Sequence, residues 1–551
     1  MSKNRLILLF FTFFFVAIIA KLFYLQILAP NTSTGYLQSR KIYPERGKIF
    51  DRNGEPLALN QSTYLLYVEP QKVKNFPKLI RSIDDVLKIG EATLSASIDK
   101  SKVWVAIRSG ISTKQKKQLE QHEVDGLGFE SQQSRYYPEA SLSSHLLGFI
   151  GKNKDNEDVG YFGIEGYYDR DLIGLPGILK SERDLQDLPI LIGTQDKTDP
   201  QHGRNLELTI DRSVQSIAKK YLSAGIEKYK AKDGCVIIAD PYTMEILALS
   251  CMPDFDPTYY YKFSESFFKN PSITSAYEPG STFKPLIMAA AINEKKVRPD
   301  DLFDENGAIE LGGYRIQTWD NKYEGKITMT RILEKSSNVG MVYIGDKLGR
   351  KKTYEYIKNY GFGQPTGIDL QGEVGSYLRH PNAWYPIDYA TATFGQGIAV
   401  TPMQMIRAFS SLVNGGELLE PHVVKKIISD SQEKTVDKKV VRRVISPLTS
   451  EIIKKMLVST VENGEYKWAR PPGYKIGGKT GTAQVAIQGH YDSSKTIASF
   501  IGFAPASHPK FIAIVVLSEP KTSIYGSETA APLFFDIAKE LLIYYNIAPE
   551  Q

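Results

Sequence analysis

The chain opens with an apolar run that differs from everything after it. From Leu6 to Leu28 the only charged residue is Lys21, which lies near the far end. At about 1.5 Å per residue, a helix of about 20 such residues spans roughly 30 Å, the thickness of a bilayer core. We therefore expect a transmembrane helix over residues 6–27, preceded by a short cytoplasmic tail over residues 1–5.

Flanking charges predict the orientation of this helix. Lys3 and Arg5 precede it, and the positive-inside rule then places the N-terminus in the cytoplasm and the chain after about residue 28 outside. A cleaved signal peptide is the competing interpretation, because the apolar run suits either. Ile18 and Ala20 fit a cleavage site poorly, so we expect an uncleaved, single-pass anchor.

Two patterns follow the anchor. Residues 36–200 mix short strand-like runs, such as Thr63–Val68, with charged, turn-rich connections, which predicts an extended β-rich module. From Leu206 onward, an amphipathic helix over residues 214–229 precedes a hairpin pattern over residues 234–249.

The end of the chain repeats the second pattern. It has strand-like runs over residues 496–504 and 510–517, and a closing helix over residues 531–545. Strands at both ends with helices between them predict one antiparallel sheet with a helical insertion. We therefore expect an α+β domain over residues 203–546, attached to the β-rich module and preceded by the transmembrane helix.

Composition narrows the chemistry. A net charge of +6 over 551 residues is too dilute for a nucleic-acid-binding surface, so no nucleic acid is expected as a partner. The chain has seven His and two Cys, without HExxH or CxxC spacing, which provides no metal-binding pattern. No metal and no cofactor are expected.

The two cysteines, Cys235 and Cys251, fall on the two arms of the predicted hairpin. A cross-strand disulfide is one alternative, since the compartment is expected to be oxidising. Each cysteine lies among apolar neighbours, which is typical of buried free thiols, and on that ground we expect two free thiols.

Ser281-x-x-Lys284 is the first candidate for chemistry. Residues three apart on a helix share a face, so the Lys284 amine can take the proton from the Ser281 hydroxyl as it attacks an acyl carbon. Pro279 and Gly280 allow a tight turn that places Ser281 at a helix N-terminus, where negative charge is favoured. The spacing alone is not specific, because it recurs at Ser97, Ser216, Ser266, Ser431, Ser507 and Ser518.

The second candidate, over residues 473–480, satisfies the G-x-x-x-x-G-K-[ST] phosphate-loop pattern, which taken literally predicts an ATPase. Its context argues against this interpretation, because two prolines precede it and strand-like residues follow it. We expect an edge strand that presents a cation, hydroxyls and amides to an anionic peptide terminus. The residues concerned are Lys479, Thr480, Gly481 and Thr482.

A third candidate, Ser336-x-Asn338, is expected to place a hydroxyl and a carboxamide on a loop after a helix. Ser336 follows Ser281 by 55 residues, and Lys479 follows Ser336 by 143. In this order and at these separations, the three motifs resemble the active-site motifs of penicillin-binding proteins and serine β-lactamases. Further matches make the chain similar, over nearly its whole length, to class B penicillin-binding proteins, the monofunctional D,D-transpeptidases. These matches are Arg46–Gly54, Arg135–Pro138, His145–Gly148, Gly163–Tyr168, Asp240–Ala248 and Phe394–Gly397.

This resemblance implies a penicillin-binding transpeptidase fold on a pedestal formed by residues 36–200. Ser281 would attack the penultimate D-Ala carbonyl of a peptidoglycan stem peptide, and β-lactams would acylate the same hydroxyl. Lys284 would act as a neutral base, with its pKa lowered by burial and by the charge of Lys479. Ser336 would relay the proton to the leaving amine, and Asn338 would orient Lys284 and the donor amide.

The resemblance also implies how the donor is held. Lys479, Thr480 and Thr482 would bind its carboxylate, and Gly481 would let it approach the strand closely. The amides of Ser281 and Thr482 would form the oxyanion hole.

Membrane partners are implied as well, namely a polytopic glycosyltransferase of the SEDS type and other division or elongation proteins. Asn338 and the stretch Ser499–Pro505 favour a septal over an elongation role. The alternatives are a β-lactamase of the same fold and a sensor acylated by β-lactams. The long N-terminal module and the anchor oppose the first, and the short expected cytoplasmic tail opposes the second.

Overall fold

The computed structural model describes residues 3–28, 37–182, 195–487 and 490–549. The chain forms two compact units, one of Met1–Arg46 with Ile173–Gly203 and one of Gly47–Leu172 with Arg204–Gln551. Each unit is described separately below.

The first unit contains the apolar N-terminal helix α1 (Lys3–Phe23), which continues into a π-helical turn over Tyr24–Leu28. Among the described residues, Arg5–Phe23 is the one helical stretch long and apolar enough to cross a membrane, which fits a single-pass anchor. The same unit holds a three-stranded antiparallel sheet in the order β1-β8-β9. Its strands are β1 (Leu37–Ile42), β8 (Gly177–Glu182) and β9 (Gln195–Thr198).

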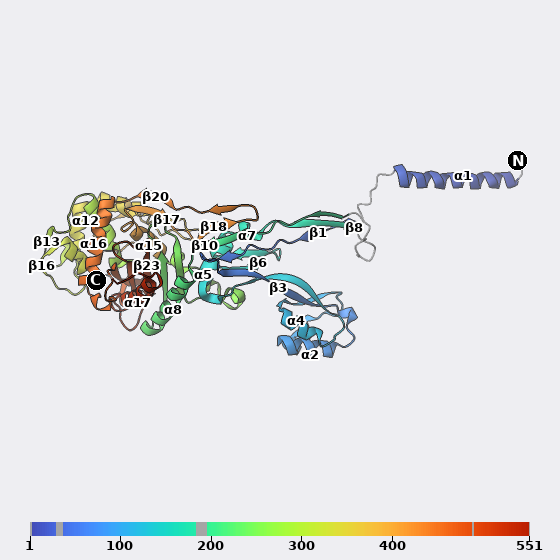
Figure 1. Ribbon diagram of the computed structural model, residues 1–551, viewed down its shortest axis with the longest axis horizontal. Coiled ribbons are helices and arrows are strands. Elements are labelled where there is room, and N and C mark those ends of the chain that lie inside the picture. Colours follow the sequence, from blue (N-terminus) through green and yellow to red (C-terminus); the bar gives the residue numbers. More distant parts are fainter. Residues whose placement is uncertain (1–2, 29–36, 183–194, 488–489, 550–551) are drawn as a thin grey trace. The chain divides into compact units, whose positions relative to one another are not determined.

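The second unit begins with a sheet in the order β19-β18-β10-β2-β3-β4, to which β5 adds by pairing with β3. Helices α2, α3 and α4 lie against its far end (Figure 1). The strands are β2 (Ile49–Phe50), β3 (Pro56–Val68), β4 (Val105–Ile111), β5 (Leu127–Tyr136), β10 (Asn205–Leu208), β18 (Val424–Ile428) and β19 (Glu433–Thr435). The helices are α2 (Phe76–Leu87), α3 (Glu91–Ser97) and α4 (Thr113–Glu120).

The prediction that turn-rich connections join these strands is wrong where the helices occur. In α2, Leu79, Ile83 and Leu87 recur every four residues and are buried against the sheet residues Leu66 and Val68. A helix with such a face gains its stability from tertiary packing more than from intrinsic propensity. Because the packing partner is not visible in the sequence, the charged residues of α2 are interpreted there as a loop.

Short elements connect this region to the rest of the second unit. They are α5 (Ser144–Leu147), β6 (Phe149–Lys152), β7 (Asp158–Tyr161), α6 (Gly163–Tyr167) and α7 (Asp169–Ile173).

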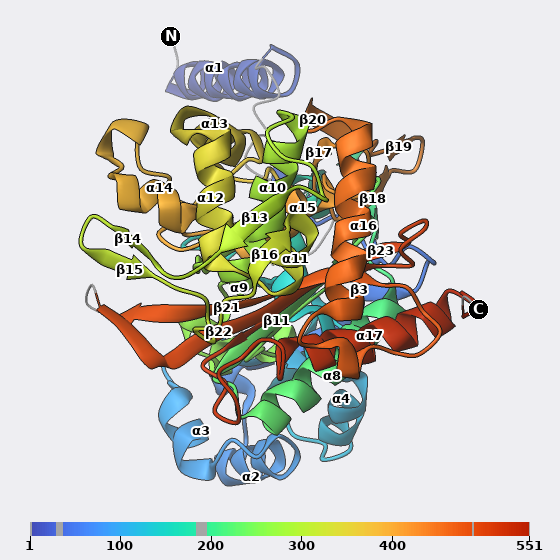
Figure 2. The same cartoon turned by 90° about the vertical axis from the view of Figure 1, so that its left-hand side faces the viewer.

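The centre of the second unit is a five-stranded sheet in the order β12-β11-β23-β22-β21, in which every neighbouring pair is antiparallel. Helices α8 (Arg212–Tyr229) and α17 (Ala530–Tyr544) cover one face, and α10 (Lys284–Asn293) and α15 (Pro402–Ser410) lie on the other (Figure 2). The strands are β11 (Asp233–Ala239), β12 (Ile246–Met252), β21 (Gly477–Ile487), β22 (His490–Ala504) and β23 (Phe511–Ser518). The predicted α+β fold with its antiparallel sheet is confirmed.

Most of the regular secondary structure between β12 and β21 is helical, as predicted. The helices are α9 (Pro271–Thr274), α10 (Lys284–Asn293), α11 (Met329–Glu334), α12 (Asn338–Leu348), α13 (Arg350–Asn359), α14 (Pro386–Ala392), α15 (Pro402–Ser410) and α16 (Pro447–Asn463). Three small two-stranded antiparallel sheets accompany them: β13 (Leu302–Glu305) with β16 (Gly325–Thr328), β14 (Ile309–Leu311) with β15 (Tyr314–Ile316), and β17 (Glu417–Glu420) with β20 (Lys439–Arg443).

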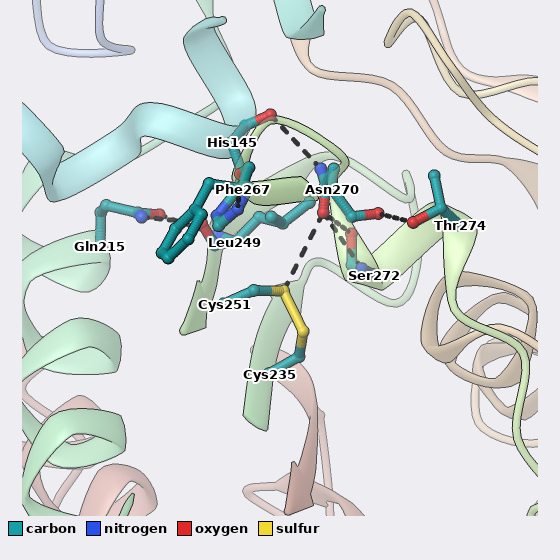
Figure 3. The surroundings of a disulfide bond; sticks show 9 residues. All are labelled: His145, Gln215, Cys235, Leu249, Cys251, Phe267, Asn270, Ser272 and Thr274. Carbon is teal, nitrogen blue, oxygen red and sulfur yellow. Dashed lines mark hydrogen bonds between the residues drawn. A yellow bond between two sulfur atoms is a disulfide. The ribbon is translucent and has the colours of Figure 1, made fainter. Parts of the chain in front are cut away.

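The prediction of two free thiols is wrong, because Cys235 and Cys251 form a disulfide (Figure 3). The register of β11 with β12 places them directly opposite each other, with Cα atoms 4.1 Å apart. Directly opposed residues on antiparallel strands lie close enough to be bridged. The hairpin was visible in the sequence, but its register, which a bulge between Ile238 and Ala239 shifts, was not.

Candidate active site

Ser281 lies in a 3₁₀ turn, Gly280–Phe283, that runs directly into α10, as the Pro-Gly pair before it predicted. Gly280 has φ +54°, and its N–H donates to Gly395 O at 3.1 Å. A Cβ on Gly395 would lie 2.2 Å from Gly280 O, so only glycine allows this close approach. Within the described residues the Ser281 hydroxyl has no hydrogen-bond partner, which leaves it available to a substrate.

The strand β21 lies directly against the Ser281 turn. A Cβ on Gly481 would be 2.8 Å from Pro279 O and 2.9 Å from Thr282 Cγ2, so the strand could not come as close with any other residue. β21 is the last strand of its sheet, and strand rather than helix continues after Thr480. The edge-strand prediction is confirmed, and the phosphate-loop interpretation is wrong because it needs a helix there.

Lys284 joins the first and third motifs. Its side chain is fully buried, and its Nζ donates to Ser336 O at 2.5 Å, to Ser336 Oγ at 3.2 Å and to Asn338 Oδ1 at 2.8 Å. Groups 52 and 54 residues away in the sequence therefore surround one amine. This arrangement allows a proton to pass between Lys284 and the Ser336 hydroxyl.

The prediction that Asn338 lies on a loop is wrong, because Asn338 is the first residue of α12. The reason is that Ser337 caps this helix, with its Oγ accepting from Gly340 N–H at 2.9 Å. The Asn338 Nδ2 donates to Gln317 O at 3.0 Å, which holds the carboxamide with its oxygen toward Lys284.

Burial and like charge dominate the electrostatics of the site. Burial, followed by the charge of Lys479, holds the pKa of Lys284 well below its usual range, as predicted. Burial also lowers the pKa of Lys479 to about 8. In the described part of the chain neither lysine forms an ion pair. The hydrogen bonds of the Lys479 Nζ in that part of the chain go to Thr480 O at 3.4 Å and Thr480 Oγ1 at 3.2 Å, and the charge of Glu465 partly offsets the effect of burial on the pKa of Lys479. Because no ion pair engages it there, this cation can accept a carboxylate from a ligand.

The rest of the strand motif is arranged beside Lys479. Thr480 is buried, and the Thr482 Oγ1 accepts from Gly526 N–H at 2.9 Å, which leaves its proton free for a ligand oxygen. The structure thus brings all three motifs to one place, the edge of β21 opposite Lys284.

Several residues of this site escaped the sequence analysis. Gln317 positions Asn338 through a backbone oxygen, which no side-chain pattern reveals. Trp319 and Tyr525 meet edge to face, with ring centroids 5.8 Å apart, on loops that follow Gln317 and precede Gly526. Both side chains are large and exposed in the structure, but in the sequence only their aromatic character could have drawn attention to them. Among the described residues, no group of three His, Cys, Asp or Glu side chains could hold a metal ion.

Comparison with known proteins gives consistent results. The model of the penicillin-binding protein transpeptidase domain matches residues 234–539, and that of the penicillin-binding protein dimerisation domain matches residues 41–208. Stage V sporulation protein D of Bacillus subtilis is 38% identical and covers 99% of this chain and 86% of that protein. A peptidoglycan D,D-transpeptidase FtsI homolog of Mesostigma viride is 30% identical, covering 99% of this chain and 96% of that protein.

A solved structure is similar throughout. Penicillin-binding protein 2X of Streptococcus thermophilus has a TM-score of 0.76 and 25% identity, over 93% of this chain and 80% of that one. With a transpeptidase model over more than half of its length and a pedestal model before it, this chain belongs to the class B penicillin-binding proteins.

Proposed function

We propose that this protein is a serine-type peptidoglycan D,D-transpeptidase that cross-links stem peptides through an acyl-enzyme on Ser281. The observation that carries the proposal is the convergence of Ser336 and Asn338 on the buried Lys284 amine, one helical turn from Ser281 and opposite β21. The lowered pKa of Lys284 favours the neutral amine that can act as a base at neutral pH.

In the proposed reaction Ser281 Oγ attacks the penultimate D-Ala carbonyl while its proton passes to Lys284 Nζ. The amides of Ser281 and Thr482 stabilise the oxyanion. When the intermediate collapses, the C–N bond to the terminal D-Ala breaks, and the proton reaches the leaving amine through the Ser336 hydroxyl. The amine of a neighbouring stem peptide then attacks the ester and forms the cross-linking amide bond. The C–O bond to Ser281 breaks, and the proton lost by the amine passes through Lys284 to Ser281 Oγ.

The donor carboxylate binds at β21 in this proposal. Lys479 supplies the positive charge, and the hydroxyls of Thr480 and Thr482 supply hydrogen bonds. Gly481 keeps this strand close to the Ser281 turn, so that a peptide bound along β21 reaches Ser281. β-Lactams would use the same groups and acylate Ser281.

The experiment that tests this proposal is acylation by a labelled penicillin, followed by mapping of the modified peptide. Label should appear on the peptide that contains Ser281 and disappear in Ser281→Ala. Label on Ser507 or Ser518, or label that survives in Ser281→Ala, would contradict the assignment. The lifetime of the acyl-enzyme separates the two classes of activity, because a β-lactamase would release hydrolysed penicillin within seconds whereas a transpeptidase would keep the label.

We also propose that α1 anchors the protein with its N-terminus in the cytoplasm and its catalytic domain outside. Lys3 and Arg5 before the apolar stretch support this orientation. The proposed partners are a SEDS-type glycosyltransferase and other division proteins in the membrane. A shortened chain that starts near Gly35 should still bind penicillin, but it should fail to replace the full chain in cells because it is no longer held near nascent glycan.

A further inference from the structure

Next to the Ser336-x-Asn338 motif lies a buried carboxylate that has no role in the proposed reaction. Glu305, the last residue of β13, is completely buried. Its Oε1 accepts a short hydrogen bond from Ser337 Oγ. Its Oε2 accepts from Lys335 Nζ at 2.8 Å and from Glu324 N–H at 3.3 Å. Every bond of this carboxylate is therefore made inside the protein.

Two of these partners are the residues on either side of Ser336. Lys335 precedes it and is almost fully buried, and its Nζ also donates to Lys322 O at 2.7 Å. Ser337 follows Ser336 and caps α12. One carboxylate thus fixes the chain immediately before and immediately after the proposed proton relay.

Ser336 itself has a backbone conformation that needs such support. Its φ is +59°, in the left-handed region that residues with a Cβ rarely adopt and keep only where their surroundings impose it. In this conformation both Ser336 O and Ser336 Oγ face the Lys284 amine. A relaxed backbone at Ser336 would turn at least one of them away.

We propose that Glu305 is a positioning residue for acylation: by binding Lys335 and Ser337 it holds Ser336 in the conformation that keeps its hydroxyl at Lys284. This inference rests on the proposed function, since it gives Glu305 a role only if Ser336 relays a proton. Glu305 itself touches neither the substrate nor the reacting atoms.

A purely structural role for the ion pair accounts for these contacts less well. A buried salt bridge is weak evidence for stability, because the cost of removing two charges from water offsets their attraction. Here Lys335 also lies 3.8 Å from Glu324, which Arg331 binds through Nε and Nη2 at 2.9 Å each. Several charged side chains therefore hold the short loop that contains Ser336. Such a network is expected where the position of a backbone segment must be fixed closely.

The test is the kinetics of penicillin acylation in the full-length double variant Glu305→Gln/Lys335→Met. Removing both charges together avoids leaving either one buried and unpaired. We expect the first-order acylation rate constant to fall by about 10- to 100-fold, because small displacements of a catalytic group have effects of this size. The dissociation constant of the noncovalent complex should stay within about twofold, because the carboxylate-binding strand β21 is unchanged.

Glu165 and Arg135 provide a matched control. They form a second buried ion pair, 2.6 Å between Arg135 Nε and Glu165 Oε1, in the part of the unit that precedes the catalytic domain. Glu165→Gln/Arg135→Met removes the same charges at the same burial, and it should leave the acylation rate constant unchanged even where thermal unfolding shifts. An equal loss of rate in both double variants would show a general effect of destabilisation and overturn the inference.

Ser337→Ala keeps the inference testable if the double variant does not fold. It removes one arm of the Glu305 contact, and the acylation rate constant should fall about tenfold without a change in the noncovalent constant. Ser446→Ala, which removes the comparable cap of α16, controls for the lost helix cap. Wild-type rates in a folded Glu305→Gln/Lys335→Met variant, or in Ser337→Ala, overturn the positioning role. Failure of the wild-type chain to label at Ser281 would instead overturn the proposed function.

Discussion

Two buried polar clusters in the second unit differ in how they use their hydrogen bonds. Around His145, the groups bind the protein itself: His145 Nε2 donates to Phe267 O at 3.0 Å, and Gln215 Nε2 donates to Leu249 O at 2.8 Å (Figure 3). In the active site, Lys284 is surrounded by hydrogen-bond acceptors, while Lys479 is buried and forms no ion pair among the described residues.

The difference shows what burial does in each place. In the junction around His145, which also contains the Cys235–Cys251 disulfide, the side chains of His145, Gln215 and Asn270 bind other groups of the protein, and the cluster joins the pedestal region to the catalytic sheet. In the active site, burial lowers the pKa of both Lys284 and Lys479. We therefore expect changes in the active site to alter chemistry with little effect on stability, and changes in the junction to do the reverse.

The largest effect is expected for Lys284→Arg. A guanidinium with a pKa above about 12 cannot act as a neutral base, so the acylation rate should fall by about 10³-fold or more. The measurement is the rate of labelling of Ser281 by penicillin, with the thermal unfolding midpoint determined in parallel. Lys269→Arg, in the exposed Ser266-x-x-Lys269 sequence, is the control and should acylate normally. Near-normal acylation of Lys284→Arg would mean that another group takes the proton.

Removing the disulfide should have the opposite signature. Cys235→Ala/Cys251→Ala opens a loop with a sequence separation of 16 residues, which lowers the free energy of unfolding by about 3 kcal/mol. Thermal unfolding of the full-length protein in detergent checks this loss, and the acylation rate at 25 °C should stay within about twofold. A loss of acylation without a loss of stability would remove the distinction between the two clusters.

His145 should make stability depend on pH. Burial lowers its pKa to about 4, whereas the unfolded chain takes up the proton near about 6.5. Stability from this group is complete above about pH 6.5 and decreases as the pH falls toward 4, by about 2 kcal/mol between pH 7.5 and 5. His145→Gln can keep the bond to Phe267 O and does not titrate, so its unfolding midpoint should vary less over this range. Parallel pH curves for the two proteins would contradict the role of His145.

The smallest effect is expected on the alkaline side of acylation. Lys479 has a pKa of about 8, so above that pH it loses the charge that binds the donor carboxylate. The second-order rate constant of acylation should therefore fall about fivefold between pH 8 and 9. Lys479→Arg keeps its charge, and its profile should stay level over this range even if its absolute rate is lower. If the wild type and Lys479→Arg lose acylation rate equally above pH 8, another group is responsible for the decrease.

The local sequence was sufficient for much of this protein. The strands of the central sheet, the extended conformation of Lys479 to Thr482 and the turn at Ser281 all follow from short-range patterns: alternation of apolar and polar residues, a glycine within a strand, and Pro-Gly before a helix. Each depends on residues within about ten positions of one another, where periodicity and turn chemistry act directly.

What brings these segments together is long-range packing, which the sequence does not display. The register of β11 with β12 decided the disulfide, and contacts across 52 and 54 residues brought Ser336 and Asn338 to Lys284. Glu305 was invisible as a candidate, because a single glutamate carries no pattern until tertiary structure places it between Lys335 and Ser337. Sequence patterns record which groups are present, whereas burial, register and the partner of each charge depend on contacts between residues far apart in the chain, and those contacts set the chemistry of Lys284.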